Sequence, residues 1–170
     1  LRSHGISRDE RMMEENTHGS WYYEQVELGY NYRMTELQAA LGISQLERLD
    51  DFIAERHSLA NIYNKELSGL PIFLPFQLQN TYSGMHLYVI RLKLSEIKKS
   101  HKKVFEELKE RGVGVNLHYI PVHTQPYYKK MGFNWGDFPR AEAYYQEAIS
   151  IPIFHGMTDQ QQNKVIATLL

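Results

Sequence analysis

The sequence predicts an α+β protein in which a long helix leads into a small domain, with helices over a short antiparallel or mixed sheet. Apolar residues recur at steps of three and four through residues 36–69, which is the period of a helix. Residues 86–92 are aromatic and β-branched, and residues 113–119 alternate between two faces, so both segments are predicted strands. After the long helix, strands and helices alternate along the chain, which indicates one layered body.

The composition is that of a globular protein with one core. The chain has 170 residues, of which 42% are hydrophobic and 23% are charged. Its formal net charge of -1 gives no electrostatic reason to expect nucleic acid or an anionic membrane as a partner. The absence of cysteine excludes disulfides and thiolate metal sites, and it is compatible with the cytoplasmic localisation that we expect. No apolar run reaches the roughly 18 to 20 residues of a transmembrane helix.

The first 35 residues are predicted to form a loop segment. Residues 6–27 carry eight charged side chains among scattered aromatics and follow neither a strand period nor a helix period. An irregular stretch of about 25 residues is unusual in a compact domain unless it is functional or packs on another body. Because the chain also starts without an initiator methionine, we expect it to begin inside a larger protein.

A polar segment stands at the start of the long helix. Thr35 and Gln38 have the spacing of a capping box, so the helix is predicted to begin at about Glu36. Asn31 and Arg33 lie directly upstream, and an arginine beside the free N–H groups of a helix N-terminus suits an anion such as a phosphate. The alternative is an ordinary helix cap beside a surface arginine.

The predicted helix over 36–69 ends at Gly69 and Pro71. At a rise of about 1.5 Å per residue it would span about 45 to 50 Å, which is more than a globule of this size needs. We expect it to link two bodies or to form a surface for a partner.

Residues 70–170 are predicted to form the small domain. Capping residues and apolar stripes predict three helices between and after the strands. The predicted elements are strand 86–92, helix 101–111 capped by Ser100, strand 113–119, a helix opened by Asp137 and Pro139, strand 149–153, and a last helix capped by Thr158 with Gln161.

The segment 116–128 concentrates polar and aromatic groups where the second predicted strand ends. Binding sites are frequent at strand ends with rigid loops, and two prolines stiffen this loop. Asn116 and His118 project to the same side, and the nearby tyrosine rings can stack on a sugar or a base. This combination fits a polar ligand that contains a ring. The alternative is a strand that faces a helix, with its His and Asn satisfied by backbone groups.

Other kinds of chemistry are not indicated by the sequence. His118 and His123 lack further ligands at a convincing spacing, so we expect no metal site. The Gly112-Val113-Gly114 segment is not a dinucleotide fingerprint, and no P-loop is present. The basic segment 98–103 is followed by glutamates at helical spacing, which indicates a solvated helix start. No Ser-His-Asp or paired-carboxylate arrangement stands out.

Four segments, in this order along the chain, resemble the DegT/StrS family of pyridoxal-phosphate sugar aminotransferases. The resemblance spans essentially the whole chain. The segments are Leu1-Arg2-Ser3-His4-Gly5, Gly29-Tyr30-Asn31-Tyr32-Arg33-Met34 with Gln38-Ala39-Ala40-Leu41-Gly42, His118-Tyr119-Ile120-Pro121-Val122-His123 with Gln125-Pro126-Tyr127-Tyr128, and Ser150-Ile151-Pro152-Ile153 with Met157-Thr158-Asp159.

The resemblance implies an α/β fold, namely the C-terminal part of an aspartate-aminotransferase-like (fold type I) enzyme that works as a homodimer. Residues 1–35 would then be a loop segment of the large cofactor domain, 36–69 a linking helix, and 70–170 the small C-terminal α+β domain. The implied cofactor is pyridoxal 5'-phosphate, and the implied substrate is a nucleotide-sugar.

The resemblance also implies roles for individual residues. Asn31 would reach across the dimer to the cofactor phosphate or the bound substrate, with Arg33 close by. The residues that would hold the nucleotide-sugar are Asn116, Leu117, His118, Tyr119, Tyr128 and His123.

One part of the family pattern is missing from this chain. The family forms a Schiff base between the cofactor and a lysine that lies upstream of the segment resembling residues 1–5. All ten lysines of this chain, from Lys65 to Lys164, lie downstream of that segment. We therefore predict that this chain contains no catalytic residue and is inactive alone. The whole protein is predicted to be an enzyme. The alternatives are a stand-alone binding or dimerisation module and a nucleotide-sugar-binding regulator.

Overall fold

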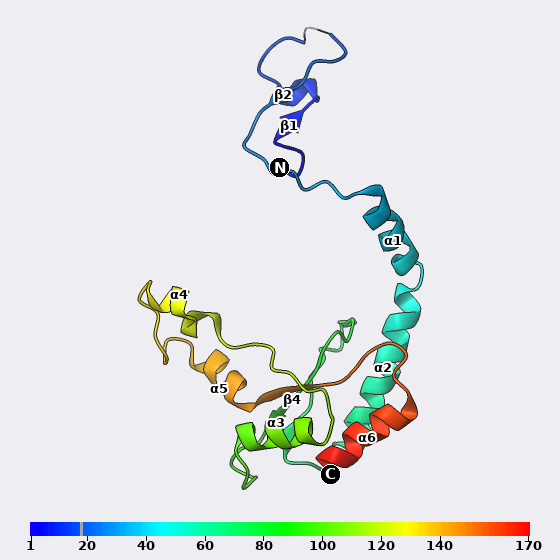
Figure 1. Ribbon diagram of the computed structural model, residues 1–170, viewed down its shortest axis with the longest axis vertical. Coiled ribbons are helices and arrows are strands. Elements are labelled where there is room, and N and C mark those ends of the chain that lie inside the picture. Colours follow the sequence, from blue (N-terminus) through cyan, green and yellow to red (C-terminus); the bar gives the residue numbers. More distant parts are fainter. Residues whose placement is uncertain (18) are drawn as a thin grey trace. The chain divides into compact units, whose positions relative to one another are not determined.

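The computed structural model describes residues 1–17 and 19–170 (Figure 1). The chain divides into two compact units, Leu1–Arg48 and Leu49–Leu170, which we call the first unit and the second unit. Each unit contains its own small antiparallel sheet.

The first unit contains a two-stranded sheet. β1 (Ile6–Ser7) pairs with β2 (Glu24–Gln25), and a 3-10 helix, η1 (Glu10–Met12), lies between them in the chain. Strands this short leave no period in a sequence, so the sequence predicts only a loop there. A Cβ on Gly5, whose φ is 71°, would lie 1.8 Å from the carbonyl oxygen of Glu27, so this close approach requires glycine.

Most of the first unit is exposed. α1 (Glu36–Leu46) has no buried residue, and Gly5 is the one buried residue among those described in this unit. Leu37 is 84% exposed and Leu41 is 63% exposed, although the helical period places both on a packed face. Apolar surface of this kind is usually covered by association with another body.

The prediction of one helix over 36–69 is wrong. α1 ends, and α2 (Leu49–Glu66) begins after a two-residue turn. The Arg48 N–H donates to the Gln45 carbonyl at 3.2 Å, which is an i to i−3 bond that tightens the last turn. Glu47 keeps right-handed helical torsions, with φ −58° and ψ −23°, so the apolar period continues through the turn and conceals it.

The second unit has a three-stranded sheet in the order β3-β4-β5. The strands are β3 (Ile72–Phe73), β4 (Tyr88–Leu92) and β5 (Ala148–Ile151). The strands predicted over 86–92 and 149–153 are therefore confirmed, with slightly different bounds. β4 alternates between buried and half-buried side chains, whereas every residue of β5 is buried. This difference places β5 deepest in the unit.

The prediction of a strand over 113–119 is wrong, because the segment pairs at only one point. Asn116 forms an isolated antiparallel bridge with Ser150, with N–H···O distances of 3.1 and 2.8 Å. The Asn116 side chain accepts the N–H of Leu117 at 2.8 Å, which removes that donor from a ladder and ends the pairing. The alternation holds for the two valines upstream, which are buried.

The helices that the sequence predicts in the second unit are confirmed. Ser100 caps the first of them by accepting the N–H of Lys103 at 3.2 Å, and Thr158 forms a capping box with Gln161 at the last. The structure adds a 3-10 helix and a short helix in the segment after the Asn116 bridge. The elements are α3 (His101–Glu110), η2 (Val122–Thr124), α4 (Pro126–Lys129), α5 (Pro139–Glu147) and α6 (Asp159–Leu169).

The core of the second unit lies where α2 and α6 meet the sheet. Figure 1 shows α6 beside α2, and the two helices are in contact. Tyr63 on α2 is fully buried and donates its hydroxyl to the Pro152 carbonyl at 2.8 Å, while Tyr88 on β4 donates to Asn64 at 2.6 Å. Burial raises the pKa of both tyrosines, so both stay neutral hydrogen-bond donors.

Among the described residues, no helix is both long enough and apolar enough to cross a bilayer.

One substitution directly after α2, in the core of the second unit, should have a large effect on stability. Leu67 is fully buried, so Leu67→Ala should lower the free energy of unfolding by about 2 to 5 kcal/mol through lost burial and the cavity left behind. Urea unfolding followed by circular dichroism measures this change. The matched control is Leu78→Ala, at a side chain that is 59% exposed, which should change stability by less than about 0.5 kcal/mol. Equal effects of the two substitutions would contradict the assignment of the core.

Candidate functional site

The helix entrance of the first unit has the geometry that the sequence predicts. Thr35 Oγ1 accepts the N–H of Gln38 at 3.3 Å, and Gln38 Oε1 accepts the N–H of Thr35 at 2.9 Å. This reciprocal capping box confirms that the helix begins at Glu36.

The backbone just before this entrance is held by the chain's first residues. Asn31 forms an antiparallel bridge with Ser3, and the Tyr32 N–H donates to the Arg2 carbonyl at 2.8 Å. The rings of Tyr30 and Tyr32 stack with centroids 4.9 Å apart. Asn31 therefore stands on a backbone that these hydrogen bonds hold, and its two neighbours in the chain are the stacked tyrosines.

Asn31 and Arg33 are both exposed, so their amide and guanidinium donors are open to a ligand. These donors, next to a helix N-terminus, suit a phosphate group. Two features weaken the attraction of the helix N-terminus for a phosphate. The capping box already uses two of the N–H groups at the entrance, and the Glu36 carboxylate occupies the first turn. An anion at this position would therefore depend mainly on Arg33 and Asn31.

In the second unit, three polar side chains meet at the isolated bridge. His118 Nδ1 lies 2.8 Å from Ser150 Oγ, and its Nε2 lies 3.4 Å from Asn116 Nδ2. Ser150 is 5% exposed, whereas Asn116 is exposed and His118 half-buried. A hydroxyl on a buried strand thus orients an imidazole at the surface.

Tyr119 and Leu117 complete this cluster. Tyr119 is 71% exposed, and its ring lies edge-on to the His118 ring with centroids 4.6 Å apart. Leu117 is half-buried and lies between the two polar residues in the chain. Four of the residues predicted to hold a ligand therefore lie together, and they present imidazole, amide and phenol groups at one surface.

His123 and Tyr128 line a separate cavity of about 340 Å³ in the second unit. Its other lining residues are Pro121, Val122, Phe133, Phe138 and Ala141. The wall is mostly aromatic and apolar, with ring centroids of Tyr128 and Phe133 6.5 Å apart. Such a wall suits the flat face of a ring.

His123 is buried and paired, which the sequence does not reveal. Its Nε2 lies 2.7 Å from Glu142 Oε1, and the same oxygen accepts the N–H of Gly136 at 2.7 Å and that of Phe138 at 3.4 Å. Burial acts to raise the pKa of the Glu142 carboxyl, but these backbone hydrogen bonds and the bond to His123 outweigh it, so the pKa is lowered.

Sequence reasoning missed Ser150 and Glu142 as parts of these groups. A serine inside the apolar strand 148–151 was a usable signal, because a buried hydroxyl needs a partner. Glu142 gave a weaker signal, since a glutamate on a helix is ordinarily solvated.

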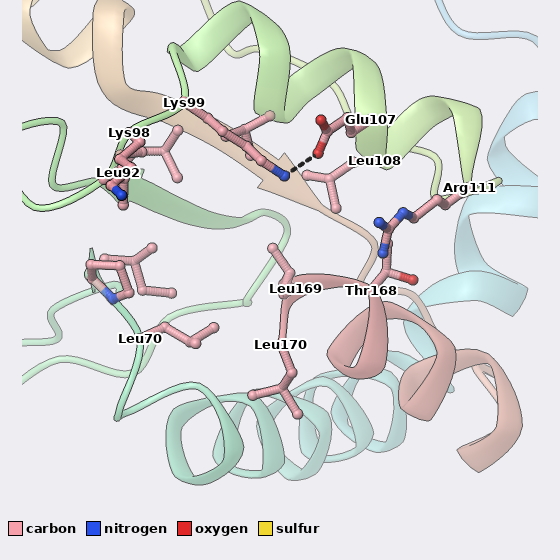
Figure 2. Close-up of a pocket in the computed structure, with 14 residues that line it drawn as sticks. Leu70, Leu92, Lys98, Lys99, Glu107, Leu108, Arg111, Thr168, Leu169 and Leu170 are labelled. Atoms are coloured by element: carbon pink, nitrogen blue, oxygen red, sulfur yellow. Dashed lines mark hydrogen bonds and ion pairs between the residues drawn. The ribbon is translucent and has the colours of Figure 1, made fainter.

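A further cavity of about 420 Å³ lies between α3, the β3 and β4 strands and the end of α6. Figure 2 shows leucine side chains that line it, together with the ion pair between Lys99 and Glu107, at 2.5 Å. None of the predicted site residues lines this cavity.

The histidines of the predicted site are used in hydrogen bonds rather than gathered with other ligands. In the part of the chain that the structure describes, no group of three His, Asp or Glu side chains is placed to hold a metal ion. All ten lysines lie in the second unit and none of them is buried. That none of them is a catalytic lysine stays a prediction.

The fold defines a class of protein, because the helices and antiparallel sheets of the two units are those of part of an α/β fold, and the groups described above are its candidate binding groups. The chain belongs to the DegT/DnrJ/EryC1/StrS aminotransferase family, whose profile matches residues 1–170.

Three relatives illustrate this membership. A UDP-4-amino-4,6-dideoxy-N-acetyl-beta-L-altrosamine transaminase of Campylobacter jejuni is 35% identical over 170 residues, which is 99% of this chain and 42% of the relative. The Helicobacter pylori PseC structure, an aminotransferase involved in the biosynthesis of pseudoaminic acid, is 26% identical with a TM-score of 0.81, over 99% of this chain and 43% of that one. The Streptococcus pneumoniae Spr1654 structure in its PLP form is 27% identical with a TM-score of 0.83, over 99% of this chain and 40% of that one.

The comparisons confirm the predicted fold class, because the described chain superimposes on sugar aminotransferases of fold type I over nearly all of its length. The chain spans less than half of the length of each of these three relatives.

The Glu142 carboxylate predicts a pH dependence of stability. Its pKa lies below the ordinary value of 4.5, so the unfolded chain binds this proton at a higher pH than the folded chain. The stabilisation of the fold by the ionised Glu142 carboxylate is therefore present above about pH 4.5. It is lost as the pH falls through the pKa of Glu142 in the folded chain. Urea unfolding from about pH 6 to about pH 3 should show a smaller loss of stability in Glu142→Gln than in the wild type. Equal losses would show that this carboxylate carries no such linkage.

Proposed function

We propose that this chain is the C-terminal portion of a pyridoxal-phosphate-dependent aminotransferase that aminates a nucleotide-linked 4-keto-6-deoxy sugar. The substrate we propose is of the UDP-4-keto-6-deoxy-N-acetyl-altrosamine type, with glutamate as the amino donor, as in the pseudaminic-acid pathway. The product would serve the synthesis of surface or flagellin glycans in the cytoplasm. Membership of the aminotransferase family over residues 1–170 carries this proposal.

The relatives support the proposed substrate class. One is named as an altrosamine transaminase and another as an aminotransferase of pseudoaminic acid biosynthesis, and both match nearly the whole chain. The cluster at Asn116, His118 and Tyr119 offers the hydrogen-bonding and stacking groups that a sugar nucleotide requires. The cavity lined by His123 and Tyr128 offers a second aromatic surface.

Asn31 and Arg33 are the residues that we propose to contact the cofactor. Pyridoxal phosphate, when bound, supplies the chemistry that carries an amino group from donor to acceptor. The exposed amide of Asn31 and guanidinium of Arg33 have donors suited to its phosphate, and the bridge to Ser3 holds the backbone that presents them. In a homodimer, Asn31 would serve the site of the neighbouring subunit. The exposed leucines of α1 support an interface at this unit.

The proposal is tested by comparing the full-length protein with the 170-residue chain. The full-length protein should convert a UDP-4-keto-6-deoxy sugar to its amino form with glutamate, as measured by mass spectrometry of the product. The 170-residue chain should give no product and should not develop the visible absorbance of lysine-bound pyridoxal phosphate. Product from the short chain would contradict the predicted absence of the catalytic lysine. Tight binding of the sugar nucleotide by the full-length protein without any amine transfer would favour a binding module.

The proposed reach of Asn31 across the dimer is tested by mixing two inactive variants of the full-length protein. One carries Asn31→Ala and the other lacks the upstream lysine. Randomly mixed subunits should recover about a quarter of the wild-type activity, because about half of the dimers are mixed and each has one intact site. If Asn31 served the site of its own subunit, both sites of a mixed dimer would stay damaged and no activity would return. Mixing each variant with itself is the control.

A further inference from the structure

We infer that Glu142 is a positioning residue for the ligand cavity of the second unit, because it holds the His123 ring and the opposite wall of that cavity with one carboxylate oxygen. The inference rests on the proposed function, since it assigns the cavity to the ring-bearing part of a nucleotide-sugar. Glu142 itself does not line the cavity.

The carboxylate joins two separate segments. On one side, Oε1 lies 2.7 Å from His123 Nε2, which belongs to η2. On the other side, the same oxygen accepts the N–H groups of Gly136, at 2.7 Å, and Phe138, at 3.4 Å, in the turn before α5. Glu142 is 5% exposed, so little water competes for these bonds.

These two segments are the walls of the cavity. Val122 and His123 come from η2, whereas Phe133 and Phe138 flank the turn that contains Gly136. The Phe138 ring lies against the His123 ring with centroids 4.8 Å apart, and the Phe133 and Phe138 centroids are 6.2 Å apart. A change at the carboxylate would therefore shift both walls, although the cavity itself is aromatic.

The pairing also decides which nitrogen of His123 can meet a ligand. Because Nε2 faces the carboxylate, Nδ1 is the ring nitrogen without a hydrogen bond among the described residues. His123 lines the cavity, although only 8% of the residue is exposed. A ligand ring stacked on the aromatic wall would meet Nδ1 as its polar contact.

Binding to the full-length protein tests the inference, with UDP-N-acetylglucosamine as the probe and calorimetry as the measurement. Glu142→Gln keeps the shape of the side chain but removes its charge, and it should raise the Kd of the probe about 10-fold. Glu147→Gln is the matched control on the same helix, where the carboxylate pairs with Arg91 at 3.1 Å instead. The control should leave the Kd within about two-fold of the wild type.

A second variant separates positioning from a general loss of structure. His123→Gln retains an N–H donor toward Glu142 and removes Nδ1, so it should also raise the Kd about 10-fold. Because Glu142 acts in part through His123 and in part through Gly136 and Phe138, the double variant should bind more weakly than His123→Gln alone, but by less than the product of the two single effects. In nitrogen NMR of the folded Glu142→Gln protein, the His123 ring signals should change, because the group bonded to Nε2 is replaced, while the rest of the spectrum shows that the variant is folded.

The outcomes distinguish this inference from the proposed function. An unchanged Kd in folded Glu142→Gln, an unchanged Kd in His123→Gln, or additive effects in the double variant would overturn the positioning role. A wild-type protein that shows no saturable binding of the probe would also overturn it. Failure of amine transfer with normal probe binding would overturn the proposed function alone.

Discussion

The pairing of β5 with β4 on one side and with the isolated bridge at Asn116 on the other is the constraint on which the second unit depends. β5 is buried along its length and pairs with β4, with Ser150 opposite Val89. The same serine bridges to Asn116 on the other side and holds His118 through its hydroxyl. The polar cluster is therefore attached directly to the most buried strand. Because a rigid strand already orders the side chains of this cluster, less conformational entropy is lost when a ligand binds there.

The two candidate surfaces of the second unit are organised by different physical means. At the Asn116 cluster, a neutral hydroxyl on a strand orients the imidazole of His118. At the aromatic cavity, the buried carboxylate of Glu142 orients the imidazole of His123 and two backbone N–H groups as well. Charge-assisted bonds are shorter and stronger than neutral ones, so the second arrangement can hold two chain segments at once.

The first unit contrasts with the second, because hydrogen bonds rather than a buried core hold it together. Its helix entrance is fixed by a capping box and by bridges to the first residues of the chain, while nearly all of its side chains are exposed. Leu28 is 91% exposed and Leu37 is 84% exposed. We propose that Asn31 contributes to the site of a neighbouring subunit. Such a residue needs a fixed backbone and an apolar surface around it that the neighbouring subunit can cover.

The sequence by itself determined the elements that depend on nearest neighbours. The capping boxes at Thr35 and Thr158 and the strand at β4 follow from short-range spacing and side-chain shape, so they are readable in one dimension. Only the tertiary structure decided the turn at Glu47, where helical torsions hide the break, and the single bridge at Asn116. It also decided the partners Ser150 and Glu142. Hydrogen bonds between residues 19 to 32 positions apart depend on how the chain folds back, which no local pattern records.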